Sequence, residues 1–250
     1  MSDFRKFMNI LDAAAEVFTT WAKSIDWEDI HNRMLYLQHE LPKELEDESI
    51  KLMNRGWFIW FLEGAIDNFT EKMDSLFGKP DSKQDKYMES YVADNLNNFK
   101  DALIDSYPNR QGQIVDAFKA HESELYYSSI PTLLALAEGI GRDLYPGIGI
   151  FSKQRPNSSK VGLPKTDDVF DSISGLEIFE EAVLKPLRVS SEVTKTIHSP
   201  TNEEAKSLNR HLIMHGNSYQ YGNKINSLKA ISLVYFVHKS LTHLQGVKGT

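Results

Sequence analysis

The chain has 250 residues and a formal net charge of −7, and its content of 41% hydrophobic and 25% charged residues is ordinary for a globular protein. The absence of cysteine excludes disulfides, thiolate zinc sites and a cysteine nucleophile. No segment approaches the roughly 18 uninterrupted apolar residues of a membrane span, and the first residues lack the basic-then-apolar pattern of a secretion signal. We therefore expect a cytoplasmic protein with no membrane partner.

Acidic residues are concentrated in the first half of the chain. Residues 1–130 contain 14 Lys and Arg against 24 Asp and Glu, whereas residues 131–250 contain 14 against 11. An acidic surface repels a phosphate backbone, so a nucleic-acid-binding surface is expected in the second half. The alternative is that acidic helices only keep the protein soluble.

Helical spacing of apolar residues dominates the first 108 residues. Predicted helices cover residues 4–21, 27–40 (ended by Leu41-Pro42), 50–77 (broken near Gly56 and stopped by residues 78–80) and 83–105. The turn Tyr107-Pro108-Asn109 follows. The four tryptophans all lie in this acidic half and are expected in the core: Trp21, Trp27, Trp57 and Trp60.

The second half continues the helical pattern. Predicted helices cover residues 113–127, a mostly apolar and therefore central segment from Ile130-Pro131 to 144, residues 168–189, residues 199–214, and a last helix opening at Asn226-Ser227. The 199–214 helix starts with the capping box Thr201 to Glu204 and ends before Gly216. No alternating run predicts a strand. We expect an all-α multi-helix bundle, with an N-terminal acidic helical region over 1–108 and a helical domain over 109–250.

An irregular basic segment, residues 145–166, interrupts this pattern. It contains four cations and no acidic residue: Lys153, Arg155, Lys160 and Lys165. Irregular loops of this length are usually functional or disordered. We predict a basic flap in which Lys153 and Arg155 contact a phosphate backbone; a solvated, flexible loop is the alternative.

The most distinctive polar residues lie at the end of the 199–214 helix. Arg210, His211 and His215 are followed by Gly216. Histidine can remove the proton of an RNA 2′-hydroxyl or protonate the leaving oxygen, while arginine stabilises charge on the transition state. On an ideal helix Arg210 and His215 would point roughly 140° apart, so they converge only if the last turn loosens or a second protomer contributes.

Two other interpretations fit the same residues. Cationic side chains are favoured at a helix C-terminus by the helix dipole alone. His211 and His215, four residues apart, share a helix face and could bind zinc. The zincin pattern, however, requires Glu after the first histidine, where this chain has Leu212, and no third ligand is evident. We therefore predict no metal site and no cofactor.

Polar and aromatic residues flank the histidines. Asn217, Tyr219 and Tyr221 follow them, and Asn209 precedes them. A nucleobase stacked on a tyrosine contributes about 1–3 kcal/mol in proteins that bind single strands. We predict that these four residues bind substrate, although tyrosine and asparagine are also ordinary loop residues.

The segment resembles the HEPN superfamily, and more closely a group of prophage- and defence-associated bacterial proteins with an LNRHxIxHG signature, a Tyr-Gly step and an NSLKAISL run. The matching residues are Leu208, Asn209, Arg210, His211, Ile213, His215, Gly216, Tyr221, Gly222, Asn226, Ser227, Leu228, Lys229 and Ala230. Residues 129–140 are similar to the upstream helix of that group, with Glu138-Gly139 at its acidic-Gly step. The resemblance covers roughly residues 115–245.

The resemblance implies a bundle that dimerises, so that two Arg/His motifs face each other. It implies Arg210 and His215 as catalytic residues of a metal-independent endoribonuclease, with His211 in the polar position after the arginine. Glu138 would hold a histidine or the arginine in place. RNA substrate, a homodimer, and an antitoxin or another phage-defence protein are the expected partners. Some HEPN domains are non-catalytic, so a helical module that binds a nucleotide, nucleic acid or protein is the alternative.

Overall fold

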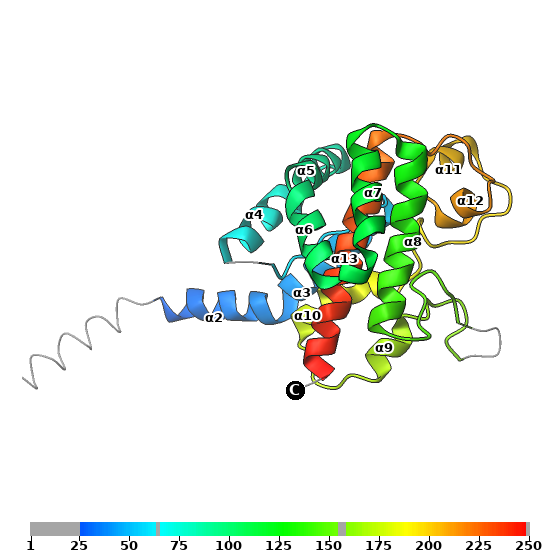
Figure 1. Cartoon of the computed structure of the whole chain (residues 1–250). Coiled ribbons are helices and arrows are strands. Elements are labelled where there is room, and N and C mark those ends of the chain that lie inside the picture. Colours follow the sequence, from blue (N-terminus) through cyan, green and yellow to red (C-terminus); the bar gives the residue numbers. More distant parts are fainter. Residues whose placement is uncertain (1–25, 64–65, 155–158, 249–250) are drawn as a thin grey trace, which may run out of the picture. The chain divides into compact units, whose positions relative to one another are not determined.

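The computed structural model describes residues 26–63, 66–154 and 159–248 (Figure 1). This part of the chain contains no β-strand, only a single antiparallel bridge between Lys153 and Pro164, so the all-α prediction is confirmed. The predicted helix over 4–21, Trp21, the side chain of Trp27 and Arg155 lie outside the described residues. The α-helices are α2 (Trp27–Leu35), α3 (Leu41–Asn54), α4 (Ile66–Leu76), α5 (Asp81–Asp94), α6 (Leu96–Ser106), α7 (Gln111–Glu122), α8 (Tyr126–Leu144), α9 (Asp167–Asp171), α10 (Ile178–Leu184), α11 (Asn202–Lys206), α12 (Arg210–Met214) and α13 (Lys224–Lys248).

Two compact units make up the chain, residues 1–43 and residues 44–250. The sequence suggested a division after residue 108, but α5 and α6, which precede that point, pack on α13, which follows it. None of the described helices is both long and apolar enough to cross a membrane.

In the first unit α2 runs directly into a π-helical turn, Tyr36–Glu40. The Asp26 carboxylate caps α2 by accepting a hydrogen bond from the Asp29 N–H at 2.9 Å. The predicted stop at Leu41-Pro42 is wrong, because α3 begins there. The π-helical turn has already broken the regular hydrogen-bond ladder, so the missing N–H of Pro42 is tolerated.

Helix α13 forms the centre of the second unit and runs through the middle of the bundle (Figure 1). Helix α13 begins two residues before the predicted start at Asn226. Almost every residue from Asn226 to Leu241 is buried, including polar ones such as Ser227 and His238, so the helix is enclosed around nearly its whole circumference. It packs most extensively against α8, and α7 packs on α8 in turn. The prediction that the 130–144 segment is central therefore describes α8, with α13 more central still.

A buried segment without regular structure follows the predicted break at Gly56. The sequence predicted that the helix would resume, but residues 57–61 are not helical. Each of these residues is buried, including the expected core residues Trp57 and Trp60. The Phe58 N–H donates to the Ser232 hydroxyl at 3.3 Å, and the Phe58 ring lies 5.6 Å from that of Phe236.

Two other predicted helices are interrupted. Residues 83–105 divide into α5 and α6 at Asn95, whose side-chain amide donates to the Tyr91 carbonyl at 2.8 Å and so competes with the helix ladder. Residues 168–189 form α9, α10 and a 3-10 turn, Lys185–Leu187, instead of one helix.

Helix α8, by contrast, begins four residues before the predicted Ile130-Pro131 start. Pro131 therefore lies inside it, where its missing N–H leaves the Tyr127 carbonyl free to accept from the Tyr221 hydroxyl at 3.3 Å.

A histidine-rich basic cluster as candidate site

The predicted helix over 199–214 is wrong, because it divides into α11 and α12. The capping box at the start of α11 is confirmed, since Thr201 and Glu204 cap each other's backbone N–H groups. The chain then turns extended at Ser207, and Asn209 begins a new helix. Arg210 therefore occupies the first turn of a five-residue helix rather than the end of a long one.

Asn209 causes this restart of the helix. Its carboxamide oxygen accepts from the Leu212 N–H at 2.9 Å, and its amide group donates to the carbonyls of Glu192 at 2.7 Å and Lys195 at 3.0 Å. The side chain is buried, with 0% exposure. The structure thus gives Asn209 a capping role and places it away from any surface that a substrate could reach.

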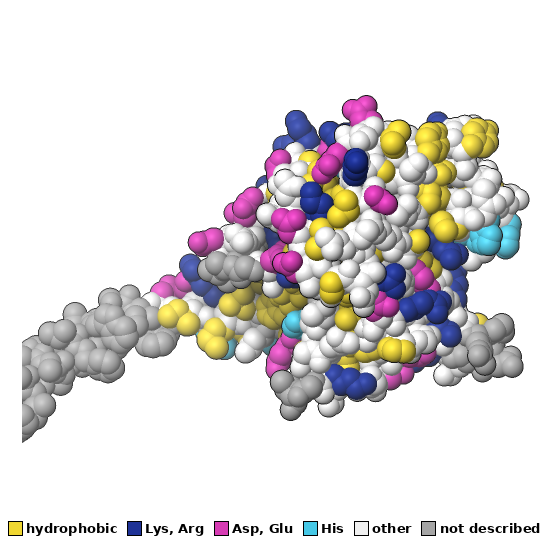
Figure 2. Space-filling model, in the orientation of Figure 1, with side chains coloured by type: hydrophobic (Ala, Val, Ile, Leu, Met, Phe, Trp, Pro, Cys, Tyr) yellow, Lys and Arg dark blue, Asp and Glu magenta, His cyan; other side chains and the backbone are white. Residues whose placement is uncertain are grey.

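Three histidines gather at α12: His211 in its first turn, His215 at its C-cap and His198 from the preceding segment. The rings of His211 and His215 lie 4.6 Å apart, centre to centre, which confirms that they share a face. His198, which sequence analysis missed, lies 5.6 Å from the His211 ring. His215 caps the helix and Gly216 follows with a φ of +70°, the left-handed ending that was predicted. Figure 2 shows these histidine side chains together at one edge of the molecule.

The cluster is strongly basic. Burial lowers the pKa of His211, and the nearby charges of His215, His198, Arg210 and Lys153 lower it further. The Arg210 guanidinium lies 5.6 Å from the centre of the Phe151 ring, and within the described residues it forms no ion pair. We call Lys153, His198, Arg210, His211 and His215 the basic cluster. It favours an anionic ligand.

Metal binding has no support in the described part of the chain. Within residues 26–63, 66–154 and 159–248, no group of three or more His, Asp or Glu side chains is arranged to hold a metal ion. His211 and His215 are joined by His198 only through ring contacts, not by a carboxylate.

Glu138 does not contact Arg210 or a histidine directly. Its carboxylate accepts from Arg142 at 2.8 Å and 2.9 Å, and from the Phe151 N–H at 3.2 Å. Because the Phe151 ring lies beneath the Arg210 guanidinium, Glu138 acts on the basic cluster through the backbone of Phe151. The direct contact of Glu138 with a histidine or with Arg210 that the resemblance implied is therefore not present among the described residues.

An exposed aromatic patch lies on the segment after the basic cluster. The Tyr127 hydroxyl of α8 donates to the Tyr219 carbonyl at 2.9 Å, and the rings of Tyr127 and Tyr221 meet edge to face at 5.1 Å. Tyr219 itself is 76% exposed. Asn217 is exposed as well. We call Tyr127, Tyr219 and Tyr221 the tyrosine patch; Tyr127 was not among the predicted binding residues.

The described residues of the basic segment, 145–154 and 159–166, form backbone hydrogen bonds and ion pairs. Around the Lys153–Pro164 bridge, the Gln154 N–H donates to the Leu163 carbonyl at 2.9 Å and the Lys165 N–H to the Ser152 carbonyl at 2.8 Å. Lys160 forms ion pairs with Asp167 and Asp171, so these carboxylates neutralise its charge. Lys153 is exposed and belongs to the basic cluster.

Comparison of the chain with protein-family models, with curated proteins and with solved structures found no match.

Proposed function

We propose that the protein is a metal-independent endoribonuclease of the HEPN type whose site is the basic cluster. The observation that carries this proposal is the His211–His215 ring pair, which lies beside Arg210 at a half-exposed helix end. Two imidazoles and a fixed cation are the groups that phosphodiester transesterification requires. The resemblance of residues 208–230 to HEPN proteins adds a second, separate support.

In the proposed reaction, neutral His211 removes the proton of the ribose 2′-hydroxyl. The 2′-oxygen then attacks the adjacent phosphorus, and the bond from phosphorus to the 5′-oxygen breaks. Protonated His215 donates a proton to that 5′-oxygen, while Arg210 stabilises the negative charge of the phosphorane-like transition state. The products carry a 2′,3′-cyclic phosphate and a 5′-hydroxyl. The lowered pKa of His211 keeps its ring neutral and able to accept a proton at neutral pH.

Substrate binding would extend from the basic cluster to the tyrosine patch. Lys153 contributes a phosphate contact, and the exposed Tyr219 ring offers a stacking surface for an unpaired base. Both features favour single-stranded RNA. In line with the resemblance, we further propose that the protein acts as a homodimer in phage defence or as a toxin-like effector, with an antitoxin or another defence protein as its regulator.

Incubation of the purified protein with total RNA and tRNA in EDTA tests the activity. We expect the wild type to leave 2′,3′-cyclic phosphate ends, and His215→Ala and Arg210→Ala to cleave about 100-fold more slowly or not at all, because general acid catalysis and charge stabilisation each contribute about that much. His39→Ala, which removes an exposed histidine from the first unit, is the matched control and should cleave like the wild type.

The alternatives give different results. Cleavage that EDTA abolishes would point to a metal enzyme. RNA binding without cleavage at any pH from about 5 to about 9 would point to a non-catalytic module that uses the basic cluster to hold phosphate. Melting temperatures near that of the wild type for the Arg210 and His215 variants would separate a loss of chemistry from a loss of fold.

A further inference from the structure

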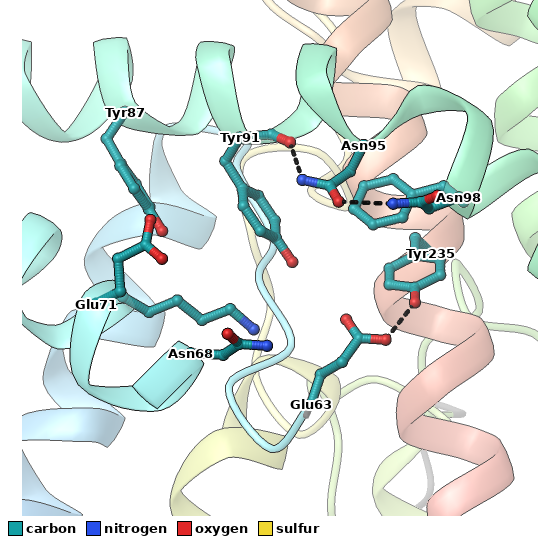
Figure 3. Close-up of a pocket in the computed structure, with 10 residues that line it drawn as sticks. Glu63, Asn68, Glu71, Tyr87, Tyr91, Asn95, Asn98 and Tyr235 are labelled. Carbon is teal, nitrogen blue, oxygen red and sulfur yellow. Dashed lines mark hydrogen bonds between the residues drawn. The ribbon is translucent and has the colours of Figure 1, made fainter. Parts of the chain in front are cut away.

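A cavity of about 310 Å³ lies between α4, α5, α6, α13 and the segment before α4 (Figure 3). Ligand cavities typically begin at about this size and combine aromatic walls with a few polar groups. Aromatic rings line one side: Tyr87 and Tyr91 stack at 6.0 Å, and Phe99 and Tyr235 stack at 3.8 Å.

Lys72 supplies a buried positive charge to this cavity. It is 4% exposed, and its ammonium group donates to the Trp60 carbonyl at 2.7 Å. Within the described residues no carboxylate forms an ion pair with it. Burial lowers its pKa, and the nearby charges of Glu63 and Glu71 oppose that shift. A buried cation without a paired anion is unfavourable, so an anionic group of a ligand would be stabilised there.

Glu63 supplies the opposite charge. Tyr235 donates its hydroxyl to Glu63 Oε1 at 2.5 Å, and Lys239 pairs with the same oxygen at 3.1 Å. The other carboxylate oxygen, Oε2, has no hydrogen bond within the described residues, and in Figure 3 the side chain rises into the cavity from below Tyr91 and Tyr235. Glu71 adds a second carboxylate at the exposed rim beside Tyr87.

The cavity therefore contains charges of both signs: Lys72, which forms no ion pair within the described residues, and Glu63, of which only Oε1 is paired. A phosphate-bearing ligand would bring at least one negative charge against two carboxylates and a single buried ammonium group. A purely cationic ligand would meet Lys72. A molecule with an ammonium group and a carboxylate on adjacent atoms satisfies both sides at once.

We propose that this cavity binds a free α-amino acid with an apolar or aromatic side chain. Its carboxylate pairs with Lys72, its ammonium group with Glu63 Oε2, and its side chain packs against the rings of Tyr91 and Phe99. The site is separate from the basic cluster and does not depend on the proposed nuclease activity.

Calorimetry and thermal-shift measurements on the full chain test this site, with phenylalanine, tyrosine, tryptophan, leucine and methionine as probes. At least one of them should bind and raise the melting temperature. N-acetylphenylalanine and phenylalaninamide, which each lack one charge of the zwitterion, should bind about tenfold more weakly or not at all. Absence of binding by all five amino acids would overturn the proposal, as would equal binding of the two blocked analogues or binding of nucleosides alone.

Variants locate the binding site. Lys72→Met keeps the apolar stem of the side chain and removes its charge, so the bound amino acid should lose at least about tenfold in affinity. Glu71→Gln, at an exposed position where folding is not at risk, should weaken binding by a smaller factor. Lys224→Met, on α13 but outside the cavity, is the matched control and should bind like the wild type. Unchanged affinity in Lys72→Met would overturn the proposal; if that variant does not fold, unchanged affinity in Glu63→Gln, which removes the charge that pairs with the ammonium group, would do so.

Discussion

At the scale of single residues, Asn209 shows how a motif position can serve the fold rather than the chemistry. It stands next to Arg210 in the sequence, yet its side chain is buried and makes three hydrogen bonds, one as the cap of α12 and two to carbonyls before α11. It fixes the point at which α12 starts. The position of the basic cluster therefore depends on Asn209, although Asn209 has no access to a ligand.

Replacement of Asn209 by alanine should lower the free energy of unfolding by roughly 2 kcal/mol or more. The variant loses the helix cap, and the partly buried carbonyls of Glu192 and Lys195 lose their donor. Urea unfolding monitored by circular dichroism measures the loss. Asn217→Ala is the matched control, because Asn217 is exposed, and its effect should be within about 0.5 kcal/mol of zero. Equal stability of the two variants would contradict the capping role.

At the scale of elements, the link between α12 and α13 is held against α8 by close contact. A side chain at Gly222 would place its Cβ 2.5 Å from three ring atoms of Tyr127, so only glycine fits beside that ring. The Tyr127 ring in turn contacts Tyr221, and its hydroxyl holds the backbone of Tyr219. The Tyr-Gly step thus keeps the tyrosine patch in place.

Gly222→Ala should force Tyr127 to rotate and should break its hydrogen bond to the Tyr219 carbonyl. We expect a loss of about 1 kcal/mol in stability. We also expect weaker binding of single-stranded RNA, because the tyrosine patch is disturbed. Fluorescence anisotropy with a labelled oligonucleotide measures the binding. Gly246→Ala, in α13 where nothing lies within 4 Å of the added Cβ, is the matched control and should be neutral or slightly stabilising. RNA binding that Gly222→Ala leaves unchanged would show that the tyrosine patch takes no part in it.

At the scale of the whole molecule, two buried histidines join the core helices of the second unit. His121 of α7 forms a hydrogen bond with the Ser227 hydroxyl of α13 at 2.8 Å, and His238 of α13 forms one with the Tyr107 hydroxyl at 3.0 Å. Burial lowers the pKa of both, and that of His238 to about 4. The core therefore holds both rings in their neutral form.

The lowered pKa values of these buried histidines make the stability of the fold depend on pH. The unfolded chain takes up a proton on His238 below its ordinary pKa of 6.5, whereas the folded chain does so only near 4. Stability is therefore complete above pH 6.5 and falls as the pH decreases toward 4, by up to about 3 kcal/mol for this residue. The free energy of unfolding, measured with urea between about pH 7 and about pH 5, tests this dependence. In that range most carboxylates remain ionised, so the change reports on histidines. His238→Gln should show a shallower decline, with the remainder due to His121 and His211, whose pKa values are also lowered; an identical decline would rule out His238 as the cause.

The sequence alone was sufficient for the all-α class, because apolar spacing and capping signals are local. The capping box at Thr201, the break at Gly56 and the left-handed end at Gly216 were all predicted correctly for this reason. The shared face of His211 and His215 also follows from local geometry. Their roles in RNA cleavage stay a prediction.

Tertiary structure decided the rest, since each outcome depends on contacts between distant residues. Asn209 ends one helix and starts another because carbonyls of residues 192 and 195 lie within reach of its amide. His198 joins the basic cluster and Phe151 lies under Arg210 through packing that no local spacing reveals. The cavity around Lys72 likewise brings together residues from 63 to 235. Lys72 has no ion pair among the described residues there because the fold buries its ammonium group against the Trp60 carbonyl instead of against a carboxylate.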